Sequence, residues 1–411
     1  MAVRRQALHV AARALEQRLN ADTSDQERAR PCACGQAARF AGRRAKRVTT
    51  ALGTLTLTRA YYHCAACGQG FCPRDQALGV AATTLSPAVT RMVGAVGALV
   101  SFQEGSALLR ELAGVTVDPK HVERAAEALG RAIAVDERGV VEAAPTADAP
   151  TLYLGLDGTG IPMRASELSG GAGKQPDGSA KTREAKLCTV WSAEGRAPDG
   201  TPVRDPGSVT YSAAIESAAT RDADTEASAF AQRVRREAQR RGFDHAARRV
   251  VLGDGAPWIW NLAEEHFPGA LQIVDRFHAK QHLSDVAKAL YGPTSDVGHA
   301  WAKQRHAELD AGDLVALRRA LTRAAPRCDE ARTCGEYLER NRARMRYPLF
   351  HAQGLCTSTG VVEAGCKVAI GTRLKRAGMH WTVGGANAIL ALRCCRLSGR
   401  FEDFWERRAM A

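Results

Sequence analysis

The stretch TLYLGLDGTG, residues Thr151–Gly160, decides the expected fold. Apolar residues alternate along it and stop at Asp157, which has glycines close on both sides. This pattern predicts a buried strand that ends in a tight turn and delivers one carboxylate there. Because a carboxylate at the end of a core strand is costly without a partner, a metal ion is a natural candidate. Such a metal site would need further carboxylates in similar settings.

Two later strands are predicted to end in the same way. Arg248–Gly253 leads to Asp254, which lies between two glycines, and Ala270–Val274 leads to Asp275. A helix that begins at Pro257 separates these two strands. Three strands are expected before them, at Thr151–Asp157, Glu184–Ala193 and Ser208–Ser212, followed by a charged helix at Asp222–Gly242. This order is typical of a ribonuclease-H-like α/β fold, in which a mixed sheet carries helices on both faces.

Asp157 and Asp254 would then meet at one edge of the sheet, where two carboxylates can hold a divalent cation. Glu363 is the candidate third acid, because STGVVE places Ser358 or Thr359 near a helix N-cap and Glu363 in the first turns. Three carboxylates plus substrate phosphates suffice for two Mg²⁺ ions, and Mn²⁺ could replace them. Two such ions could activate a water or a 3′-hydroxyl at a phosphodiester. The chain has 44 acidic residues, so three acids with no common site are the alternative.

A cysteine cluster precedes this region. Two knuckles, Cys32-Ala-Cys34-Gly and Cys64-Ala-Ala-Cys67-Gly, flank two predicted strands that turn at Gly53. This layout predicts a zinc-ribbon-like segment with four thiolate ligands, although the first knuckle is one residue tighter than usual. The alternatives are four small buried hydrophobes or a metal site that this chain has lost. A site with four cysteines would be structural, because it leaves no coordination position open for catalysis.

Three helices are predicted between the cysteine cluster and the first core strand. They begin at Pro87, Gln103 and Pro119, with a turn at residues 113–118. Helix, glycine-containing turn and helix are compatible with a helix-turn-helix that reads DNA, and equally with a small helical bundle. Residues 135–150 are expected to be a linker at a domain boundary.

The charge of the chain indicates its class of partner. The net charge is +13 with a pI near 9.4, and residues 1–50 contain eleven Lys or Arg and four Asp or Glu. This excess favours a polyanion such as DNA or RNA, the alternative being an Arg-rich enzyme from a GC-rich genome. The chain has no run of 18 apolar residues, and its first 20 residues lack the apolar core of a signal peptide. We therefore expect a cytoplasmic protein without a membrane partner.

The remaining segments complete the expected organisation. Residues 283–350 are dense in charged residues and alanine and are expected to form a helical insertion, and a closing helix should begin near Gly385. The expected domains are an N-terminal helix and linker (1–30), the zinc-ribbon-like segment (31–75), a helical DNA-binding region (76–135), the first part of the core (150–282), the insertion (283–350) and the C-terminal part of the core with Glu363 (351–411).

Five motifs together resemble one known family. They are GLDGTG, GDGAPWIW, DRFHAKQH, STGVVEAGCK and the closing HWTVGGANAILALRCCRLSGRFEDFW. In this order and spacing they resemble bacterial insertion-sequence transposases of the ISKra type, which are allied to the Mutator-like group. The segment YYHCAACGQGFCPRDQALG also looks like the N-terminal region of these proteins, so the resemblance covers most of residues 30–408. It implies a DDE transposase with a helical insertion before the last acid.

The resemblance assigns roles to individual residues. It places the two catalytic aspartates at Asp157 and Asp254 and the glutamate at Glu363. The Asp-x-x-His signature of the Mutator-like group falls on Asp275 and His278, which we interpret as a structural or strand-handling pair near the site. The rival interpretation, in which His278 and His282 bind zinc, lacks a third ligand.

One departure from the pattern concerns a basic residue that several DDE enzymes carry about two turns after the glutamate. That position is Ile370 here. The basic residues nearby are candidates for contacts with DNA phosphates, namely Lys367, Arg373, Lys375 and Arg376.

The function implied is transposition. The protein would bind the terminal repeats of its element, free a 3′-hydroxyl and join it to target DNA, in the bacterial cytoplasm at the nucleoid. At least two subunits are expected, because two ends must be processed together. Two alternatives stay open. One is a catalytically silent DNA-binding protein or repressor derived from a transposase, and the other is a ribonuclease-H-like nuclease without strand transfer.

Overall fold

The computed structural model describes residues 2–22, 27–139, 150–168, 181–218 and 228–410. The chain divides into two compact units, residues 1–132 and 133–411. Most of the glycine-rich stretch expected to form a loop at residues 164–184 lies outside the described residues. Within the described ranges, no helix combines the length and apolar character needed to cross a bilayer.

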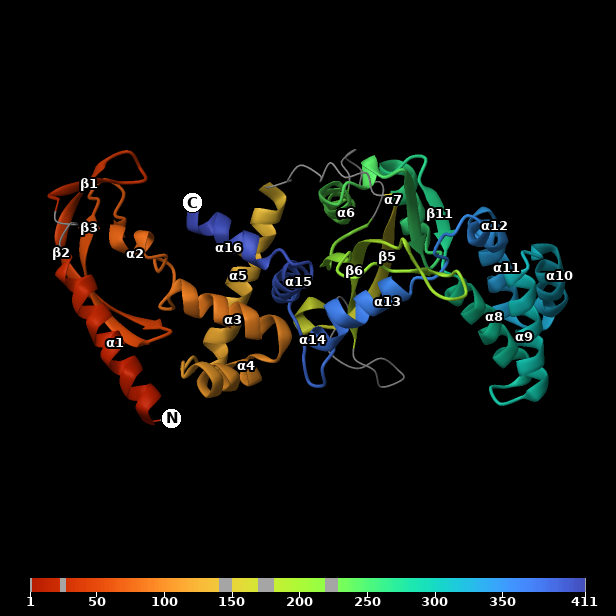
Figure 1. Ribbon diagram of the computed structural model, residues 1–411, viewed down its shortest axis with the longest axis horizontal. Helices are drawn as coiled ribbons and strands as arrows, with labels where there is room; N and C mark the ends of the chain where they lie inside the picture. The colour runs from red at the N-terminus through yellow and green to blue at the C-terminus, as the bar shows by residue number, and fades with distance from the viewer. Residues whose placement is uncertain (1, 23–26, 140–149, 169–180, 219–227, 411) are drawn as a thin grey trace. The chain divides into compact units, whose positions relative to one another are not determined.

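The first unit contains an antiparallel sheet with the order β1-β2-β3-β4 (Figure 1). Its strands are β1 (Ala29–Pro31), β2 (Ala37–Thr50), β3 (Gly53–His63) and β4 (Gly70–Phe71). Thr50 pairs with Gly53, which confirms the predicted hairpin and its turn. The first strand of the hairpin is longer than the apolar pattern indicated, because half of its 14 residues are exposed arginines and alanines.

Helix α1 (Ala2–Ala21) packs on one face of this hairpin. Ala12 lies in a small core with Val48, Leu55 and Leu57 of the two strands. At the end of the helix, the Asn20 side chain donates to the Thr56 carbonyl and accepts from the Thr58 amide. This side chain therefore takes the place of a neighbouring strand at the β3 edge.

The three helices predicted after the sheet are confirmed, with one difference at the end. They are α3 (Pro87–Leu99), α4 (Phe102–Leu108) with the π-turn η1 (Leu109–Ala113), and α5 (Pro119–Gly139), and a short helix α2 (Pro73–Ala77) precedes them. Ser86 and Ser101 cap α3 and α4 through their side chains. The linker predicted at residues 135–150 begins too early, since α5 continues to Gly139 and the boundary between the units falls within it.

The second unit is built on a mixed sheet with the order β11-β10-β5-β6-β9. The strands are β5 (Thr151–Pro162), β6 (Thr182–Ser192), β9 (Thr210–Ala214), β10 (Arg248–Gly253) and β11 (Leu271–Val274). The first three are antiparallel, whereas β10 is parallel to β5 and β11 is parallel to β10. All five core strands were predicted, and β5 is the central one. A small ribbon of β7 (Gly195–Arg196) and β8 (Pro202–Val203) lies outside this sheet.

The prediction that β5 ends in a tight turn at Asp157 is wrong. The strand continues to Pro162, and Asp157 pairs with Leu187 of β6. A Cβ added to Gly158 would lie 2.4 Å from the Glu184 side chain. The glycine that suggested a turn instead lets β5 continue past the side chains of its neighbouring strand.

Helices surround this sheet. They are α6 (Ala229–Arg240), α7 (Pro257–His266), α13 (Gly360–Gly365), the π-turn η6 (Cys366–Gly371), α14 (Thr372–Leu374), α15 (Val383–Leu397) and α16 (Phe401–Met410). Helix α13 approaches β5 at Gly155, where an added Cβ would lie 2.1 Å from Val362. This close approach brings the helix that carries Glu363 against the strand that carries Asp157. The helix predicted at Asp222–Gly242 begins at Ala229 among the described residues.

The expected insertion is helical throughout and begins directly after β11. It consists of α8 (Arg276–Tyr291), α9 (Asp296–Asp310), α10 (Leu314–Ala324), α11 (Asp329–Asn341) and α12 (Tyr347–Ala352). Two tyrosines attach it to the sheet. The Tyr337 hydroxyl donates to the Asp254 carbonyl at 2.7 Å, and the Tyr347 hydroxyl donates to the Val274 carbonyl at 3.1 Å.

Candidate active site

Three aspartates lie level with one another at one edge of the sheet. In the parallel register Leu252 pairs with Gly155, so Asp254 and Asp157 are each two residues beyond this pair. Gly253 pairs with Val274, so Asp254 and Asp275 are each one residue beyond that pair. Because these strands are adjacent and parallel, the ends of β10 and β11 bring Asp254 and Asp275 beside Asp157, which lies within β5.

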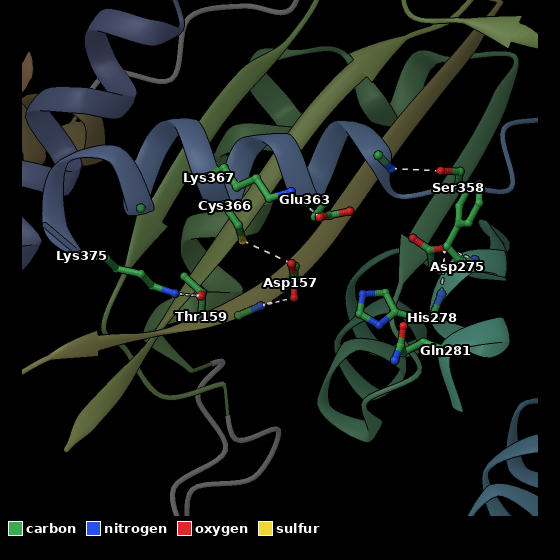
Figure 2. A pocket seen from close by; sticks show the side chains of 14 residues that line it. Asp157, Thr159, Asp275, His278, Gln281, Ser358, Glu363, Cys366, Lys367 and Lys375 are labelled. Atoms are coloured by element: carbon green, nitrogen blue, oxygen red, sulfur yellow. Dashed lines mark hydrogen bonds and ion pairs between the residues drawn. The ribbon is translucent and has the colours of Figure 1, made fainter. Parts of the chain in front are cut away.

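Asp157 lines an open cavity of about 710 Å³ together with residues of α8, α13 and η6 (Figure 2). Its Oδ1 accepts from the Gly158 amide at 2.7 Å, and its Oδ2 accepts from the Cys366 thiol at 3.3 Å. Burial raises the pKa of Asp157, and the charge of Asp254 raises it further. The hydrogen bonds and the nearby His278 offset only part of this effect, so an added cation would stabilise the ionised carboxylate.

Asp254 is half-buried at the rim of this region. Its Oδ1 accepts from the Ala256 amide at 2.8 Å, and its carbonyl accepts from Tyr337. It is close enough to Asp157 to affect the pKa of that carboxyl, although it is not among the residues that line the cavity.

Glu363 lines the same cavity as Asp157 from helix α13, as Figure 2 shows. Its side chain is about 60% exposed and its Oε1 accepts from Lys367 at 2.6 Å. The Lys367 hydrogen bond and charge lower the pKa of Glu363. Asp157, Asp254 and Glu363 do not form a group with all ligand atoms within 4.8 Å of one another, a geometry that only the four cysteines have among the described residues.

Asp275 is buried and works as a connector. Its Oδ1 accepts from the Phe277 amide at 2.5 Å and the His278 amide at 3.3 Å, which caps helix α8. Its Oδ2 accepts from the Thr359 amide at 2.7 Å and from the Thr359 hydroxyl. One carboxylate thus joins the start of α8 to the start of α13.

His278 lies in the cavity, and His282 does not share a metal site with it. The charge of His278 lowers the pKa of both Asp157 and Glu363, so its ring lies near both acids. His282 instead packs its ring against Tyr337 with 4.3 Å between centroids. No third ligand joins these histidines among the residues that the structure describes.

The four basic candidates differ in position. Lys367 and Lys375 are exposed and line the cavity, and Lys375 donates to the Thr159 hydroxyl. Arg376 is half-buried. Arg373 is fully buried, with its guanidinium 5.2 Å from the Trp381 ring centroid, so the prediction that it contacts DNA phosphates is wrong. It was predicted from its spacing after Glu363, and spacing alone does not show which face of the helix is buried.

Cys366 is a site residue that the sequence pattern did not identify. It lies buried in η6 and donates to Asp157, which is 209 positions earlier in the chain. The motif STGVVEAGCK contains this cysteine, but its spacing from Glu363 has no meaning for metal binding. Only the packing of α13 on β5 brings its thiol to the aspartate.

The four cysteines of the first unit converge as predicted. All four sulfurs lie within 4.8 Å of one another, with 3.6 Å between Cys32 and Cys67 and 3.6 Å between Cys34 and Cys64. A tetrahedral zinc site with Zn–S bonds of about 2.3 Å has sulfurs about 3.8 Å apart. The pKa of Cys64 is lowered to about 7, mainly by the hydrogen bond from the backbone amide of Cys67.

Glycines build both knuckles, including the short first one. Gly35 and Gly68 have positive φ angles of 83° and 72°, and their amides donate to the carbonyls of Cys32 and Cys64 at 2.9 Å. Each knuckle is therefore closed by its own glycine, and the hydrogen bond spans three residues in the first knuckle and four in the second. The cluster could bind a structural zinc ion.

Fold and site together define a mixed α/β protein with a four-cysteine cluster in one unit and, in the other, a cavity beside the sheet that is lined by three acids and two lysines. The chain belongs to an uncharacterised protein family, UPF0236, whose profile matches residues 35–406. No curated protein matches the chain.

Proposed function

We propose that this protein is a DDE transposase with a ribonuclease-H-like core. The strand order supports this fold: β5, β6 and β9 form an antiparallel meander, and β10 and β11 add in parallel on the other side of β5. A helical segment between β11 and α13 fits the expected insertion before the last acid. Fold alone does not define an activity, so the proposal depends on the site.

The level register of Asp157 and Asp254 is the observation that carries the proposal. Both lie two residues beyond the pair Gly155–Leu252 on adjacent parallel strands, so their carboxylates belong to one edge of the sheet. The charge of Asp254 helps to raise the pKa of Asp157, which agrees with this proximity. Two acids held together at a cost in free energy are a common feature of functional sites.

These residues fit a divalent cation. Carboxylate oxygens suit Mg²⁺ and Mn²⁺, and burial of Asp157 disfavours its charge unless a cation compensates. Glu363 would be the third ligand, which requires its carboxylate to leave Lys367. When bound, the two ions would polarise the phosphodiester and lower the pKa of the attacking water or 3′-hydroxyl.

The protein's own residues would hold the strand around these acids. Lys367 and Lys375 line the cavity and would bind phosphate oxygens as point charges. Asp275 would keep α8 and α13 in a fixed relation, so that His278 faces the same cavity as Glu363. The substrate would be the terminal repeats of an insertion element and its target DNA, and a complex of at least two subunits would process two ends together.

A strand-transfer assay with the element's end, target DNA and Mg²⁺ tests this proposal. We expect joined product from the wild type and none from Asp254→Asn. Asp244→Asn, which removes an exposed carboxylate outside the cavity, is the matched control and should keep full activity. Equal joined product from the wild type and Asp254→Asn would refute the catalytic assignment.

The pairing of Glu363 with Lys367 favours a second candidate, a DNA-binding protein or repressor without catalysis. In that case the same assay would give stable DNA binding and neither cleavage nor joining. Cleavage without joined product would instead indicate a ribonuclease-H-like nuclease.

A further inference from the structure

The segment from residue 28 to residue 74 has one sign of charge. It contains nine Lys or Arg and no Asp or Glu. This segment includes the whole β2–β3 hairpin and the cysteine cluster, so a positive field concentrates on one small structure. The proposed active site lies in the other unit and does not account for it.

The β2–β3 hairpin beyond its base is a two-stranded ribbon. β1 pairs only with residues 37–39 of β2, and β4 pairs only with Tyr62 and His63 of β3. The part from Arg43 to Thr58 therefore pairs with no further strand in the described part of the chain, apart from a single bridge between Thr49 and Leu85. Its two faces differ sharply.

One face of the ribbon is covered. Val48, Leu55 and Leu57 pack against helix α1. Two basic side chains on this face, Lys46 and Arg59, form ion pairs with Asp75 at 3.4 and 3.0 Å. The third, Arg44, is exposed and lies over the Tyr61 ring, 3.4 Å from its centroid. This face therefore serves the core of the first unit.

The other face is open and carries arginines among short side chains. Arg47 pairs with Thr56 and Ala45 pairs with Thr58, so these residues project from the same face. Arg43, Ala45, Arg47, Thr54 and Thr56 are exposed, and Thr58 is half-buried. An exposed strand face of this composition has little apolar area to bury against another protein.

We propose that this open face of the β2–β3 ribbon, formed by Arg43, Ala45, Arg47, Thr54, Thr56 and Thr58, binds duplex DNA. A two-stranded β-ribbon fits the major groove of B-DNA, which is about 12 Å wide. Arginine guanidinium groups and threonine hydroxyls donate to phosphate oxygens, and the short side chains allow the backbone of the ribbon to approach. The inference deepens the proposed function, because it names the surface that holds the DNA outside the active site.

DNA binding by the full-length chain tests this surface. Anisotropy of a fluorescein-labelled duplex is measured in Mg²⁺-free buffer over a series of salt concentrations. For Arg43→Gln/Arg47→Gln we expect weaker binding and a log–log salt slope smaller by about 1.8, which corresponds to two lost phosphate contacts. The matched control is Arg13→Gln/Arg18→Gln, which removes the same charge from exposed positions of α1. This control should leave the slope unchanged.

A second variant guards against misfolding as an explanation. Thr54→Glu adds one carboxylate at an exposed position and deletes no contact of the core. It should weaken binding in the same direction, with an unchanged zinc content and melting temperature. Binding of all variants is repeated with single-stranded DNA and with duplex RNA of the same length, for which we expect weaker binding.

Several outcomes would overturn the proposal. They are an equal loss in the α1 control, an unchanged slope in the ribbon variant, or equally tight binding of single strands or RNA. The test also separates this surface from the catalytic proposal. If DNA binding depends on the ribbon but no DNA is cleaved, only the catalytic proposal is refuted. If DNA is cleaved but the ribbon variant binds as tightly as the wild type, only the proposed DNA-binding surface is refuted.

Discussion

At Asp157, burial and the neighbouring Asp254 both disfavour the ionised carboxylate. The thiol of Cys366 and the amide of Gly158 reduce this penalty without removing it. A residue that is costly to the fold and placed in a cavity is a stronger functional candidate than an acid with a complete set of partners. Asp275 lines the same cavity and burial raises its pKa as well, but it differs in its contacts, since its two oxygens accept four hydrogen bonds and tie two helices together.

We therefore predict that replacing the Asp157 carboxylate stabilises the folded protein. A carboxyl group whose pKa is higher in the folded than in the unfolded chain destabilises the fold above the folded pKa and has no such effect below the unfolded pKa. Asp157→Asn should therefore raise the melting temperature of the metal-free protein at pH 7. The gain should shrink to zero as the pH falls towards about 4, the pKa of an unfolded aspartate.

Melting curves over a pH series check this prediction, with Asp285→Asn as the control. Burial is the largest single influence on the pKa of Asp285 and raises it, but the hydrogen bonds from Lys288 and Gln281 and the charge of Lys288 together outweigh burial and lower this pKa. This substitution should therefore lower stability at pH 7. A decrease in the melting temperature of Asp157→Asn at pH 7 would contradict the prediction.

At the scale of elements, the insertion and the sheet meet through hydroxyl groups. Tyr337 of α11 reaches the carbonyl of Asp254, and Gly255 makes room for it, because an added Cβ there would lie 2.5 Å from the tyrosine ring. Tyr347 makes a comparable bond to Val274 on the neighbouring strand. The insertion is therefore positioned by the same strand ends that carry the acids.

Tyr337→Phe and Tyr347→Phe form a matched pair. Each removes one buried hydrogen bond and should cost about 1 kcal/mol of unfolding free energy in denaturant titrations. Only Tyr337→Phe changes a contact of a proposed catalytic residue, so only this variant should also reduce cleavage. Equal effects of both variants on cleavage would show that the tyrosines matter only for stability.

The cysteine cluster is an element-scale prediction as well. We expect purified protein to contain about one zinc ion per chain, and Cys64→Ser or a strong chelator to release it. Loss of the ion should unfold the first unit, because Cys32 and Cys64 belong to a small core with Ala38, Ala60 and Tyr62. Metal analysis combined with limited proteolysis measures both effects. A metal-free protein with an intact first unit would contradict this prediction.

At the scale of the whole molecule, helix α5 continues into the second unit and joins a buried charge network there. Arg400, in the turn just before α16, bonds Glu237 of α6 at 2.9 Å and Glu137 of α5 at 3.2 Å. The side chain of Glu237 is fully buried, so its charge depends on this arginine and on Arg240 at 3.7 Å. Three helices distant in sequence are thereby fixed to one another.

Arg400→Met should destabilise the second unit by about 3 kcal/mol, since it leaves a buried carboxylate with a weaker partner. Adding Glu237→Met should recover most of this loss, because the uncompensated charge is then gone as well. Denaturant unfolding of the single and double variants measures the coupling. Additive losses would show that the two residues contribute through packing and not through their charges.

The bounds of β10 and β5 show which strand ends a local sequence pattern can predict. β10 begins and ends where the run RRVVLG predicted, since an apolar run bounded by glycine is a local signal. β5 extends beyond Asp157, because glycines next to an aspartate occur both in turns and at close approaches between strands. A turn and a close approach between strands differ only in what lies opposite the glycine. For β5 that is the Glu184 side chain of another strand.

From the sequence alone one can predict the order of the elements, the two cysteine knuckles, and that Asp157 lies on one core strand and Asp254 at the end of another, because periodicity and turn residues act over a few positions. Only the tertiary structure decided that Asp157, Asp254 and Asp275 are level, that Cys366 reaches Asp157, and that Arg373 is buried while Lys375 is exposed. These relations depend on strand register and on the face that each helix buries. Both are set by packing between segments up to 209 positions apart, which no local pattern encodes.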